Sequence, residues 1–545
     1  MPMVAELPIT MLACARLGII HSVVFGGFSG EACGLRAADS GSRVLIYMDG
    51  YYRSGRMIDH KASAEIAVAT AEKEGQKIDK VLVWKRYPEK YTSSTPMVAG
   101  RDFFVDEVLK DFHRARVEPV PLDSEHPLFL MYTSGTTGKP KGCQHRTGGY
   151  LAYTAGTSKY IQDIHPEDVY WCMADIGWIT GHSYIVYGPL AVGASAVLYE
   201  GTPNFPDAGR PWRIAERLDV NIFHTSPTAI RMLRKAGADE PKKYNYSFKH
   251  MTTVGEPIEP EVWRWYYEVV GKGKAVIVDT WWQTETGGFL CSTKPALDMM
   301  KPGSAGPGMP GIYPVILDEN AREMSPGTGR AGNLCIRNPW PGIMQTIWGD
   351  HDRFTRQYYA KYCRDKSSKR WQDWPYFAGD GALHAADGYF RILGRVDDVI
   401  NVAGHRLGTK ELESACLTVV EVAEAAVVPV VDEVKGRVPE IYISLKPGYA
   451  ATKEITDKIV ATIETMIGKI ARPKAVHIVS DMPKTRSGKI MRRVLAAISN
   501  TLDTGDITTL ANPDVVEQIR KVVQGDEKVA TKEGPEDLRL FGKEE

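Results

Sequence analysis

A segment rich in small hydroxyl and basic side chains lies between an apolar stretch and a polar stretch of the sequence. Residues 133–142 read TSGTTGKPKG and follow the apolar run at 128–132. Glycines let a backbone approach a ligand closely, hydroxyls and N–H groups donate to phosphate oxygens, and lysines balance negative charge. The composition suits a polyphosphate-binding loop, although a plain glycine-rich turn explains the same residues equally well.

Two common nucleotide-binding patterns do not fit the sequence. A P-loop requires four residues between its glycines and a Ser or Thr directly after its lysine. Here only two threonines separate Gly135 from Gly138, and Pro140 follows the lysine. A GxGxxG string occurs at residues 306–311, but it contains two prolines and no helical pattern follows it. It therefore lacks the helix N-terminus that binds a pyrophosphate.

Further motifs follow the first one in a specific order. They are VGEP at 254–257, DTWWQTETG at 279–287, FAGD at 377–380, GRVDD at 394–398 and PKTRSGK at 483–489. Together with residues 133–142 they resemble the adenylate-forming superfamily of acyl-CoA synthetases, luciferases and peptide-synthetase adenylation domains. Within that superfamily, MADIGWITGH at 173–182, WWQTET and NVAGHRLGT at 401–409 are similar to the acetyl-CoA synthetase family in particular. The likeness extends from residue 1 to about residue 523.

The resemblance implies an AMP-forming ligase that joins acetate to coenzyme A. ATP, accompanied by Mg²⁺, and coenzyme A are the expected co-substrates, and an acetyl-adenylate is the expected intermediate. We expect small-molecule partners only, with neither nucleic acid nor a membrane, and leave the oligomeric state open. Two alternatives stay open: a propionyl-CoA synthetase, and a non-catalytic nucleotide-binding fragment.

The resemblance also assigns roles to single residues in the first half-reaction. The expected catalytic residues are Lys489, which stabilises the adenylation transition state, Thr284, which donates to the α-phosphate, and Glu285, which accompanies magnesium. By itself, Lys489 would read as a solvated surface lysine, and Asp380 with Arg395 as a surface ion pair. The residues expected to contact ATP or AMP are Thr133, Ser134, Gly135, Thr136, Thr137, Gly138, Lys139, Gly255, Glu256, Pro257, Asp279, Thr280, Trp281, Trp282, Gln283, Thr284, Asp380, Arg395 and Arg406.

Two further sets of residues follow from the same resemblance. Trp282 is expected to close the acyl pocket, so that a two- or three-carbon acid fits, although such a residue is more often a core tryptophan. The expected pocket residues are Trp178, Ile179, Thr180, Val254 and Trp282. The residues expected to contact coenzyme A are Gly26, Gly27, Arg53, Arg56, Thr180, Asn204 and Gly404.

The sequence departs from the family pattern at three places. Ala403 replaces a common serine, and Glu464 replaces an arginine that contacts the coenzyme A 3′-phosphate, so we predict weaker coenzyme A binding. Val419 and Val420 stand where a His-Pro pair near a structural cation is common. We therefore assign no protein metal site.

Helix and strand patterns alternate along the part of the chain that must position these residues. Residues 4–17 predict a helix and residues 19–25 a buried strand. Helices at 214–218 and 261–270 each lead into a strand, which is typical of α/β layering. Glycine- and proline-rich turns with apolar runs at 313–317 and 332–336 predict a β-rich subdomain.

We therefore predict an α/β, multi-layer adenylate-forming large domain over residues 1–394 and a hinge over residues 395–398 around Asp397. A small mobile C-terminal α+β domain follows over residues 399–523, and a flexible tail over residues 524–545. Within the C-terminal domain, helices are expected near 409–417 and 454–467, and strands at 425–430, 441–445 and 475–479. Since Met1 aligns inside the family's large domain, we expect the large domain to be incomplete at its start.

Composition limits the class of protein. The chain has 545 residues, 43% of them hydrophobic and 25% charged, with 67 basic and 67 acidic side chains. Zero formal charge gives no global attraction to nucleic acid or to an anionic membrane. The eight cysteines are scattered without a CxxC pair, as expected for reduced thiols, and the apolar N-terminal stretch lacks a basic leader. We predict a cytoplasmic, multi-domain protein.

Overall fold

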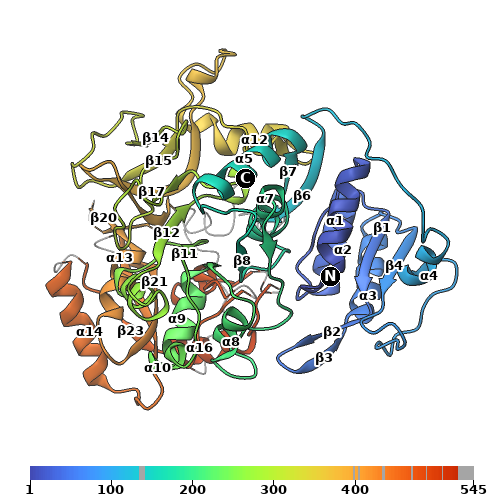
Figure 1. The fold of residues 1–545 in the computed structure, drawn as a ribbon. Helices are drawn as coiled ribbons and strands as arrows, with labels where there is room; N and C mark the ends of the chain where they lie inside the picture. The colour runs from blue at the N-terminus through green and yellow to red at the C-terminus, as the bar shows by residue number, and fades with distance from the viewer. Residues whose placement is uncertain are drawn as a thin grey trace.

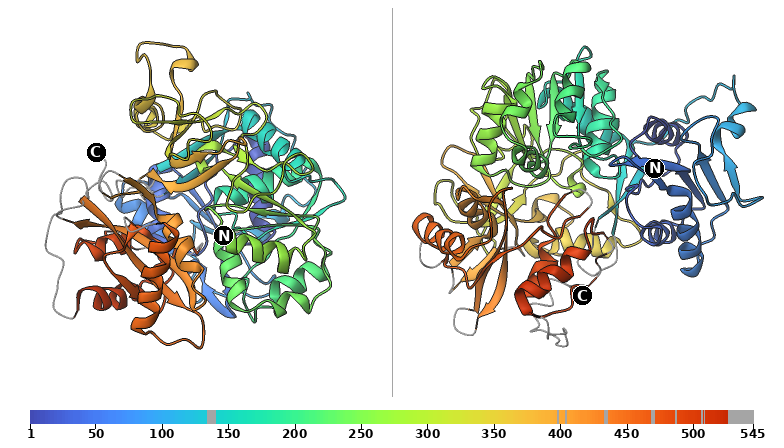
Figure 2. Two further views of the ribbon diagram at one scale, coloured as in Figure 1. Left: turned by 90° about the vertical axis from the view of Figure 1, so that its left-hand side faces the viewer. Right: turned by 90° about the horizontal axis from the view of Figure 1, so that it is seen from below.

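A computed structural model describes residues 1–133, 141–396, 399–402, 405–432, 436–467, 471–485, 488–505, 507 and 509–525. Its N-terminal elements, α1 to α4 with β1 to β5, lie on one side of the molecule, and the orange-to-red C-terminal elements lie on the opposite side (Figures 1 and 2). The central sheets lie between them. Among the described helices, none has the length and hydropathy needed to cross a bilayer.

The N-terminal elements form a small parallel sheet with helices packed on it. The strands β1 (Val44–Met48), β4 (Lys80–Trp84) and β5 (Asp102–Phe104) pair in that order. Helices α2 (Gly30–Ser40) and α3 (His60–Lys73) share a hydrophobic core with β1 and β4, and α4 (Val105–Lys110) follows β5. The buried residues of α1 (Glu6–Leu17) belong to the central core instead. Strand β2 (Gly50–Arg53) pairs with β3 (Arg56–Asp59) in a separate hairpin. Helices α2 and α3 touch closely because Gly34 has no side chain: a Cβ there would lie 2.5 Å from the Ala67 carbonyl oxygen.

The predicted helix at 4–17 is confirmed, but the predicted strand at 19–25 is wrong. Only His21 pairs, through one parallel bridge to Phe129, where its carbonyl accepts from the Leu130 N–H at 2.9 Å. Ile19 is 52% exposed. An apolar run identifies a segment that could be buried, but a strand also needs a partner along its length, and this segment has one at a single position.

The centre of the molecule is a six-stranded sheet with helices in its connections. Its order is β13 (Cys291–Ser292), β12 (Val276–Trp281), β11 (His250–Thr253), β10 (Ile222–Thr225), β8 (Val169–Cys172) and β9 (Ser195–Ala196). All neighbours are parallel except β12 and β13. The connecting helices are α8 (Arg210–Arg217), α9 (Pro227–Lys235), α10 (Asp239–Lys242) and α11 (Pro260–Trp265), which continues as η2 (Tyr266–Val270). The predicted α/β layering is confirmed.

Two antiparallel sheets adjoin the central sheet. One consists of β16 (Thr346–Ile347), β7 (Lys141–Arg146) and β6 (Pro127–Thr133), and the other of β14 (Pro314–Leu317), β15 (Gly332–Ile336), β17 (Tyr376–His384) and β18 (Phe390–Arg395). The second confirms the predicted β-rich subdomain. The accompanying helices are α5 (Thr147–Tyr160), α6 (Ile179–Gly181), η1 (His182–Tyr187), α7 (Gly188–Val192), η3 (Thr284–Thr286), α12 (His351–Tyr358), η4 (Ala360–Tyr362) and η5 (Trp371–Asp373).

The C-terminal elements form a mixed sheet with its own hydrophobic core. Strands β20 (His405–Gly408), β19 (Val399–Val402), β22 (Gly436–Leu445) and β21 (Val422–Asp432) pair in that order, and β23 (Val476–Ile478) pairs with β22. The helices are α13 (Thr409–Leu417), α14 (Lys453–Met466), α15 (Arg492–Ser499) and α16 (Asp514–Gln524). These elements confirm the predicted α+β pattern. The hinge residue Asp397 and residues 526–545 of the expected tail lie outside the described residues, and the domain boundaries stay predictions.

Candidate active site

The expected phosphate loop connects two paired strands. β6 ends at Thr133 and β7 begins at Lys141, and these two residues are partners in the antiparallel register. The remaining predicted loop residues Ser134, Gly135, Thr136, Thr137, Gly138 and Lys139 lie outside the described residues. The described strands fix where this segment leaves the sheet and where it returns.

Lys141 places a positive charge beside the predicted magnesium-associated carboxylate. Its Nζ lies 3.1 Å from Glu285 Oε1 and donates to the Tyr358 hydroxyl at 2.5 Å, and that hydroxyl donates to Glu285 Oε1 at 2.5 Å. Burial raises the pKa of Glu285, but the Lys141 charge and the Tyr358 hydroxyl outweigh it and lower the pKa to about 2. Glu285 is therefore ionised at neutral pH.

Sequence reasoning did not identify Lys141 and Tyr358 as partners of Glu285. Lys141 belongs to the motif at residues 133–142, so the sequence indicates a lysine near the phosphates. Its partner Tyr358, however, is 217 positions away in the sequence. Helix and strand periodicities relate residues only a few positions apart, so they cannot predict this contact. Thr284, next to Glu285, begins η3, and its carbonyl accepts a hydrogen bond from His145 Nε2 at 2.9 Å. The helix cap itself is Gln283.

Asp380 is a buried carboxylate held by two donors from the same chain segment. Trp281 Nε1 donates to its Oδ2 at 3.1 Å, and Gln283 Nε2 donates to the same oxygen at 2.7 Å. Arg395 is its partner in the β17–β18 register, with 3.8 Å between Arg395 Nη1 and Asp380 Oδ1. Burial raises the pKa of Asp380, while the nearby positive charges of Arg395 and Lys489 oppose the rise. The simple surface-pair reading of Asp380 is thereby excluded, since the residue is 6% exposed.

Lys489 comes to this site from the C-terminal domain. It is exposed and sits on a short hairpin in which Lys484 bridges Ile490. The neighbouring Gly488 faces α9 so closely that a Cβ on it would lie 2.8 Å from Thr228 Cγ2. The structure therefore brings the predicted catalytic lysine from the C-terminal domain to within electrostatic reach of Asp380 in the large domain.

Residues 254–257 and 279–283, which are predicted to contact ATP or AMP, lie at the carboxyl ends of two adjacent parallel strands, β11 and β12. Gly255, with φ +94°, and Pro257 follow β11, while Glu256 forms an ion pair with Arg231 of α9 at 2.7 Å. Thr280 Oγ1 donates to the Thr253 carbonyl at 2.7 Å. Crevices at such strand ends are the usual ligand sites of open α/β sheets.

Asp279 is also predicted to contact ATP or AMP, but its carboxylate is buried and bonded to neighbouring residues of the protein. Thr253 Oγ1 and the Thr280 N–H donate to its Oδ1 at 2.6 and 3.0 Å. Burial raises its pKa to about 7 despite these hydrogen bonds. The structure therefore makes Asp279 an internal support of the strand ends.

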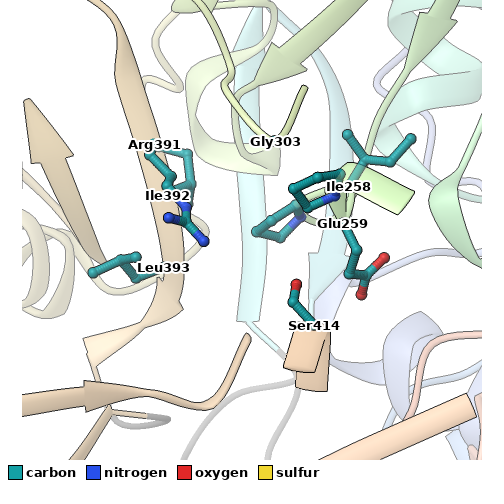
Figure 3. Close-up of a pocket in the computed structure, with 9 residues that line it drawn as sticks. Ile258, Glu259, Gly303, Arg391, Ile392, Leu393 and Ser414 are labelled. Atoms are coloured by element: carbon teal, nitrogen blue, oxygen red, sulfur yellow. The ribbon is translucent and has the colours of Figure 1, made fainter. Parts of the chain in front are cut away.

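A small pocket opens beside residues 257–260, where the large domain meets α13 (Figure 3). Its labelled residues include Ile258 and Glu259 on one side and Arg391 and Leu393 of β18 on the other, with Ser414 of α13 below. The complete lining is Pro257, Ile258, Glu259, Pro260, Gly303, Arg391, Ile392, Leu393 and Ser414. It marks the junction between the two domains.

Aromatic rings surround the predicted acyl pocket. The Trp282 indole makes edge contacts with Tyr184 at 5.1 Å and Phe289 at 5.8 Å between ring centroids. Its Nε1 is buried and has no hydrogen-bond partner among the described residues. Ile179 and Val254 are buried, and Thr180 is half-buried in α6. These surroundings fit a wall of a small apolar pocket.

Trp178 packs in a separate aromatic cluster. Its indole stacks on Phe25 at 5.7 Å and meets the edge of Phe28 at 5.6 Å, so it lies beside the predicted coenzyme A residues Gly26 and Gly27. The Arg53 guanidinium lies 5.7 Å from the Phe25 ring. Trp178 thus links the acyl-pocket residues to the predicted coenzyme A path.

The β2–β3 hairpin gathers the predicted coenzyme A contacts. Arg53 and Arg56 face each other across a two-residue turn, and both turn residues, Ser54 and Gly55, have positive φ. The turn touches Phe205, which follows the exposed Asn204 in sequence: a Cβ on Gly55 would lie 2.5 Å from that ring. The turn that joins the two arginines therefore lies against the residue that follows Asn204.

The remaining predicted contacts lie at the edge of what the structure describes. Gly404 and Ala403 fall outside the described residues, and Arg406 belongs to β20. Glu464 forms an ion pair with Arg472 at 2.9 Å, so its negative charge is balanced within the C-terminal domain.

Comparison with known proteins identifies the family of the chain. The sequence profile described as AMP-binding enzyme matches residues 1–348, and that of the AMP-binding enzyme C-terminal domain matches residues 411–489. The acetyl-coenzyme A synthetase of Wolinella succinogenes is 47% identical over 528 residues, which are 96% of this chain and 78% of that protein. That of Pyrobaculum aerophilum is 46% identical over 96% of this chain and 76% of that protein.

A solved structure supports the fold. Acetoacetyl-CoA synthetase from Streptomyces lividans superposes with a TM-score of 0.80 at 24% identity, covering 96% of this chain and 77% of that chain. This similarity concerns the fold alone. The profile matches and the two synthetases together show that the chain belongs to the acetyl-coenzyme A synthetase family of AMP-binding enzymes.

Proposed function

We propose that the chain converts acetate, ATP and coenzyme A into acetyl-CoA, AMP and pyrophosphate through an acetyl-adenylate. One observation carries the proposal. The run at residues 281–285 is fixed to Asp380 through Trp281 and Gln283 at one end and to Lys141 through Glu285 at the other. One segment thus holds Asp380, the proposed acceptor for the ribose hydroxyls, through two hydrogen bonds and itself carries Glu285, an ionised carboxylate for the phosphate side. Family membership supports the same conclusion.

In the first half-reaction, an acetate oxygen attacks the α-phosphorus of ATP. The bond from the α-phosphorus to the bridging oxygen breaks, and pyrophosphate leaves with the electron pair. Asp380 would accept hydrogen bonds from the ribose hydroxyls. Lys489 and the Thr284 hydroxyl would stabilise the charge that develops on the α-phosphoryl oxygens.

The residues present fit a substrate that arrives as magnesium–ATP. Mg²⁺ is commonly held by one or two carboxylates together with substrate phosphates. Glu285 supplies an ionised carboxylate because its pKa is lowered to about 2. In this role Glu285 helps to orient the polyphosphate, and bound Mg²⁺ would neutralise charge on the departing pyrophosphate.

In the second half-reaction, the coenzyme A thiol gives up its proton to solvent, and its sulfur attacks the acetyl carbonyl carbon. The bond from that carbon to the phosphate oxygen breaks, and AMP leaves with the electron pair. Arg53, Arg56 and Asn204 would hold the coenzyme A phosphates at the β2–β3 hairpin. Gly26, Gly27, Thr180 and Gly404 would line the path of the pantetheine arm. We assign Asp397 as the hinge through which the C-terminal domain exchanges Lys489 for Gly404 at the site.

Acetate is the proposed acid because Trp282 limits the acyl pocket. One additional methylene in an apolar pocket changes discrimination by ~1–3 kcal/mol. Propionate is thus expected to react poorly. We also propose a cytoplasmic location, which fits eight cysteines without a disulfide.

Product analysis tests this function. The purified chain is incubated with magnesium–ATP, acetate and coenzyme A, and nucleotides and thioesters are separated by chromatography. Equal amounts of AMP, pyrophosphate and acetyl-CoA are expected. ADP with inorganic phosphate, or propionyl-CoA formed faster than acetyl-CoA from equal acid concentrations, would contradict the proposal.

A further inference from the structure

A buried acidic side chain of the C-terminal domain is shared between the two domains. Glu424 of β21 is 4% exposed, and its Oε2 lies 2.8 Å from Lys484 Nζ and 3.2 Å from Lys235 Nζ. Lys484 also pairs with Asp481 at 2.7 Å. We call Lys235, Glu424, Lys484 and Asp481 the Glu424 cluster. Lys235 alone among these four belongs to the large domain, where it ends α9.

The cluster connects directly to the hairpin that carries Lys489. Lys484 begins this hairpin: it bridges Ile490, and the Met491 N–H donates to the Pro483 carbonyl at 2.8 Å. Within the hairpin, the Lys489 N–H lies 3.1 Å from Thr485 Oγ1. A contact that fixes the position of Lys484 therefore also fixes the base of the hairpin that carries Lys489.

Helix α9 contacts the C-terminal domain at both of its ends. At its first turn, Thr228 lies against Gly488, and at its last residue, Lys235 meets Glu424. Two contacts separated along one rigid helix fix an orientation better than one contact does. Lys235 also stands where a helix C-terminus favours a cation.

Charge balance in the cluster indicates what Lys235 adds. Without Lys235, Glu424 would still have Lys484 and a hydrogen bond from the Ser444 hydroxyl at 3.4 Å. Burial raises the pKa of Glu424, and the charges of Lys484 and Lys235 outweigh this effect and lower it. The C-terminal domain therefore satisfies its own buried carboxylate, and the contact from Lys235 acts between domains.

We propose that Lys235 is a positioning residue for adenylation: its ion pair with Glu424 stabilises the domain arrangement in which Lys489 faces Asp380. This inference rests on the proposed function, since it assigns Lys235 to the first half-reaction. A contact that exists in only one domain arrangement can favour only the step performed in that arrangement.

The test compares the two half-reactions in Lys235→Met. Acetate-dependent ATP–pyrophosphate exchange is expected to fall about 2- to 5-fold, the range expected for one partly exposed ion pair. Acetyl-CoA formation from supplied acetyl-adenylate should stay unchanged. Lys235→Arg should restore most of the exchange. Lys242→Met is the matched control, because Lys242 is 62% exposed and pairs with Asp239 of its own helix.

A double variant separates the interdomain contact from other effects of Lys235. Glu424→Gln alone should reduce exchange, and adding Lys235→Met should reduce it no further. If Lys235→Met leaves exchange unchanged, or lowers both half-reactions equally, the inference is overturned.

Amide hydrogen exchange gives a readout that needs no activity. In Lys235→Met, amides of residues 484, 485 and 488–491 and of the start of α9 should exchange faster than in the wild type and in Lys242→Met. Unchanged protection would contradict the inference. If wild-type protein shows no pyrophosphate exchange, the proposed function fails, and the hydrogen-exchange comparison still decides whether Lys235 holds the domains together.

Discussion

At the scale of single residues, we propose that Trp282 limits which acids can react. Its indole fills space between Tyr184 and Phe289, so Trp282→Gly should open room for longer chains. We expect the kcat/KM ratio of butyrate to acetate to rise about 100-fold or more, since each methylene admitted is worth ~1–3 kcal/mol. Specificity constants for acetate, propionate and butyrate measure this. Trp371→Gly, at a half-exposed tryptophan, is the control, and an unchanged ratio in Trp282→Gly would refute the assignment.

Asp279 gives a prediction about stability and pH. Its folded-state pKa is about 7, above the ordinary 3.8. Between about pH 4 and pH 7 the unfolded chain has lost a proton that the folded chain keeps, so this residue lowers stability as pH rises through that range. Asp279→Asn keeps an oxygen to accept from Thr253 and Thr280 and has no proton to lose.

Thermal unfolding of both proteins at pH 5 and pH 8 tests this prediction. The stability of Asp279→Asn relative to the wild type should increase from pH 5 to pH 8 by up to ~2.7 kcal/mol, which is 1.36 kcal/mol for each of the roughly two pH units between pH 5 and the folded-state pKa of about 7. A stability difference that is the same at both pH values would show that Asp279 is ionised in the folded protein throughout.

At the scale of elements, the β2–β3 hairpin should serve only the second half-reaction. Arg53 and Arg56 lie on adjoining strands of one hairpin, away from the 281–285 segment in sequence and on separate sheets. Replacing both with Ala should raise the KM for coenzyme A about 10- to 100-fold through lost charge-assisted contacts. Pyrophosphate exchange without coenzyme A should not change.

The control for the hairpin variant is Arg43→Ala in the same subdomain, where the side chain is 75% exposed and pairs with Asp79. An equal rise in the coenzyme A KM in both variants would reflect general charge and not the hairpin. Loss of exchange in the double variant would place the arginines in the first half-reaction.

Elements with strong local patterns could be predicted from sequence. Residues 332–336 and 409–417 form β15 and α13 with the predicted bounds, because glycine and polar residues end the apolar periodicity sharply there. Residues 19–25 failed because pairing depends on a partner far along the chain. For the same reason, the contacts of Lys141 with Tyr358 and of Lys235 with Glu424 could not be predicted from the sequence. Motif order placed Asp380 and Gln283 in one site, and their hydrogen bond shows that they meet.

At the scale of the whole molecule, we propose that Lys489 of the C-terminal domain completes a site built by the large domain. Lys489→Ala should reduce pyrophosphate exchange by about 100-fold or more, in the range of a lost transition-state charge contact. Thioester formation from supplied acetyl-adenylate should persist, because Lys489 has no proposed role in that step. Lys474→Ala, on the same domain, is the control. Equal loss of both activities in Lys489→Ala would indicate a damaged domain.

The most direct single measurement is acid-dependent ATP–pyrophosphate exchange by the purified wild-type chain, without coenzyme A, using acetate, propionate and butyrate in parallel. We predict exchange that requires the acid and is fastest with acetate, slower with propionate and weakest with butyrate. Absence of exchange from folded protein would contradict adenylation at the site formed by Asp380, Glu285 and Lys489, and exchange that is equally fast with butyrate would contradict a pocket closed by Trp282.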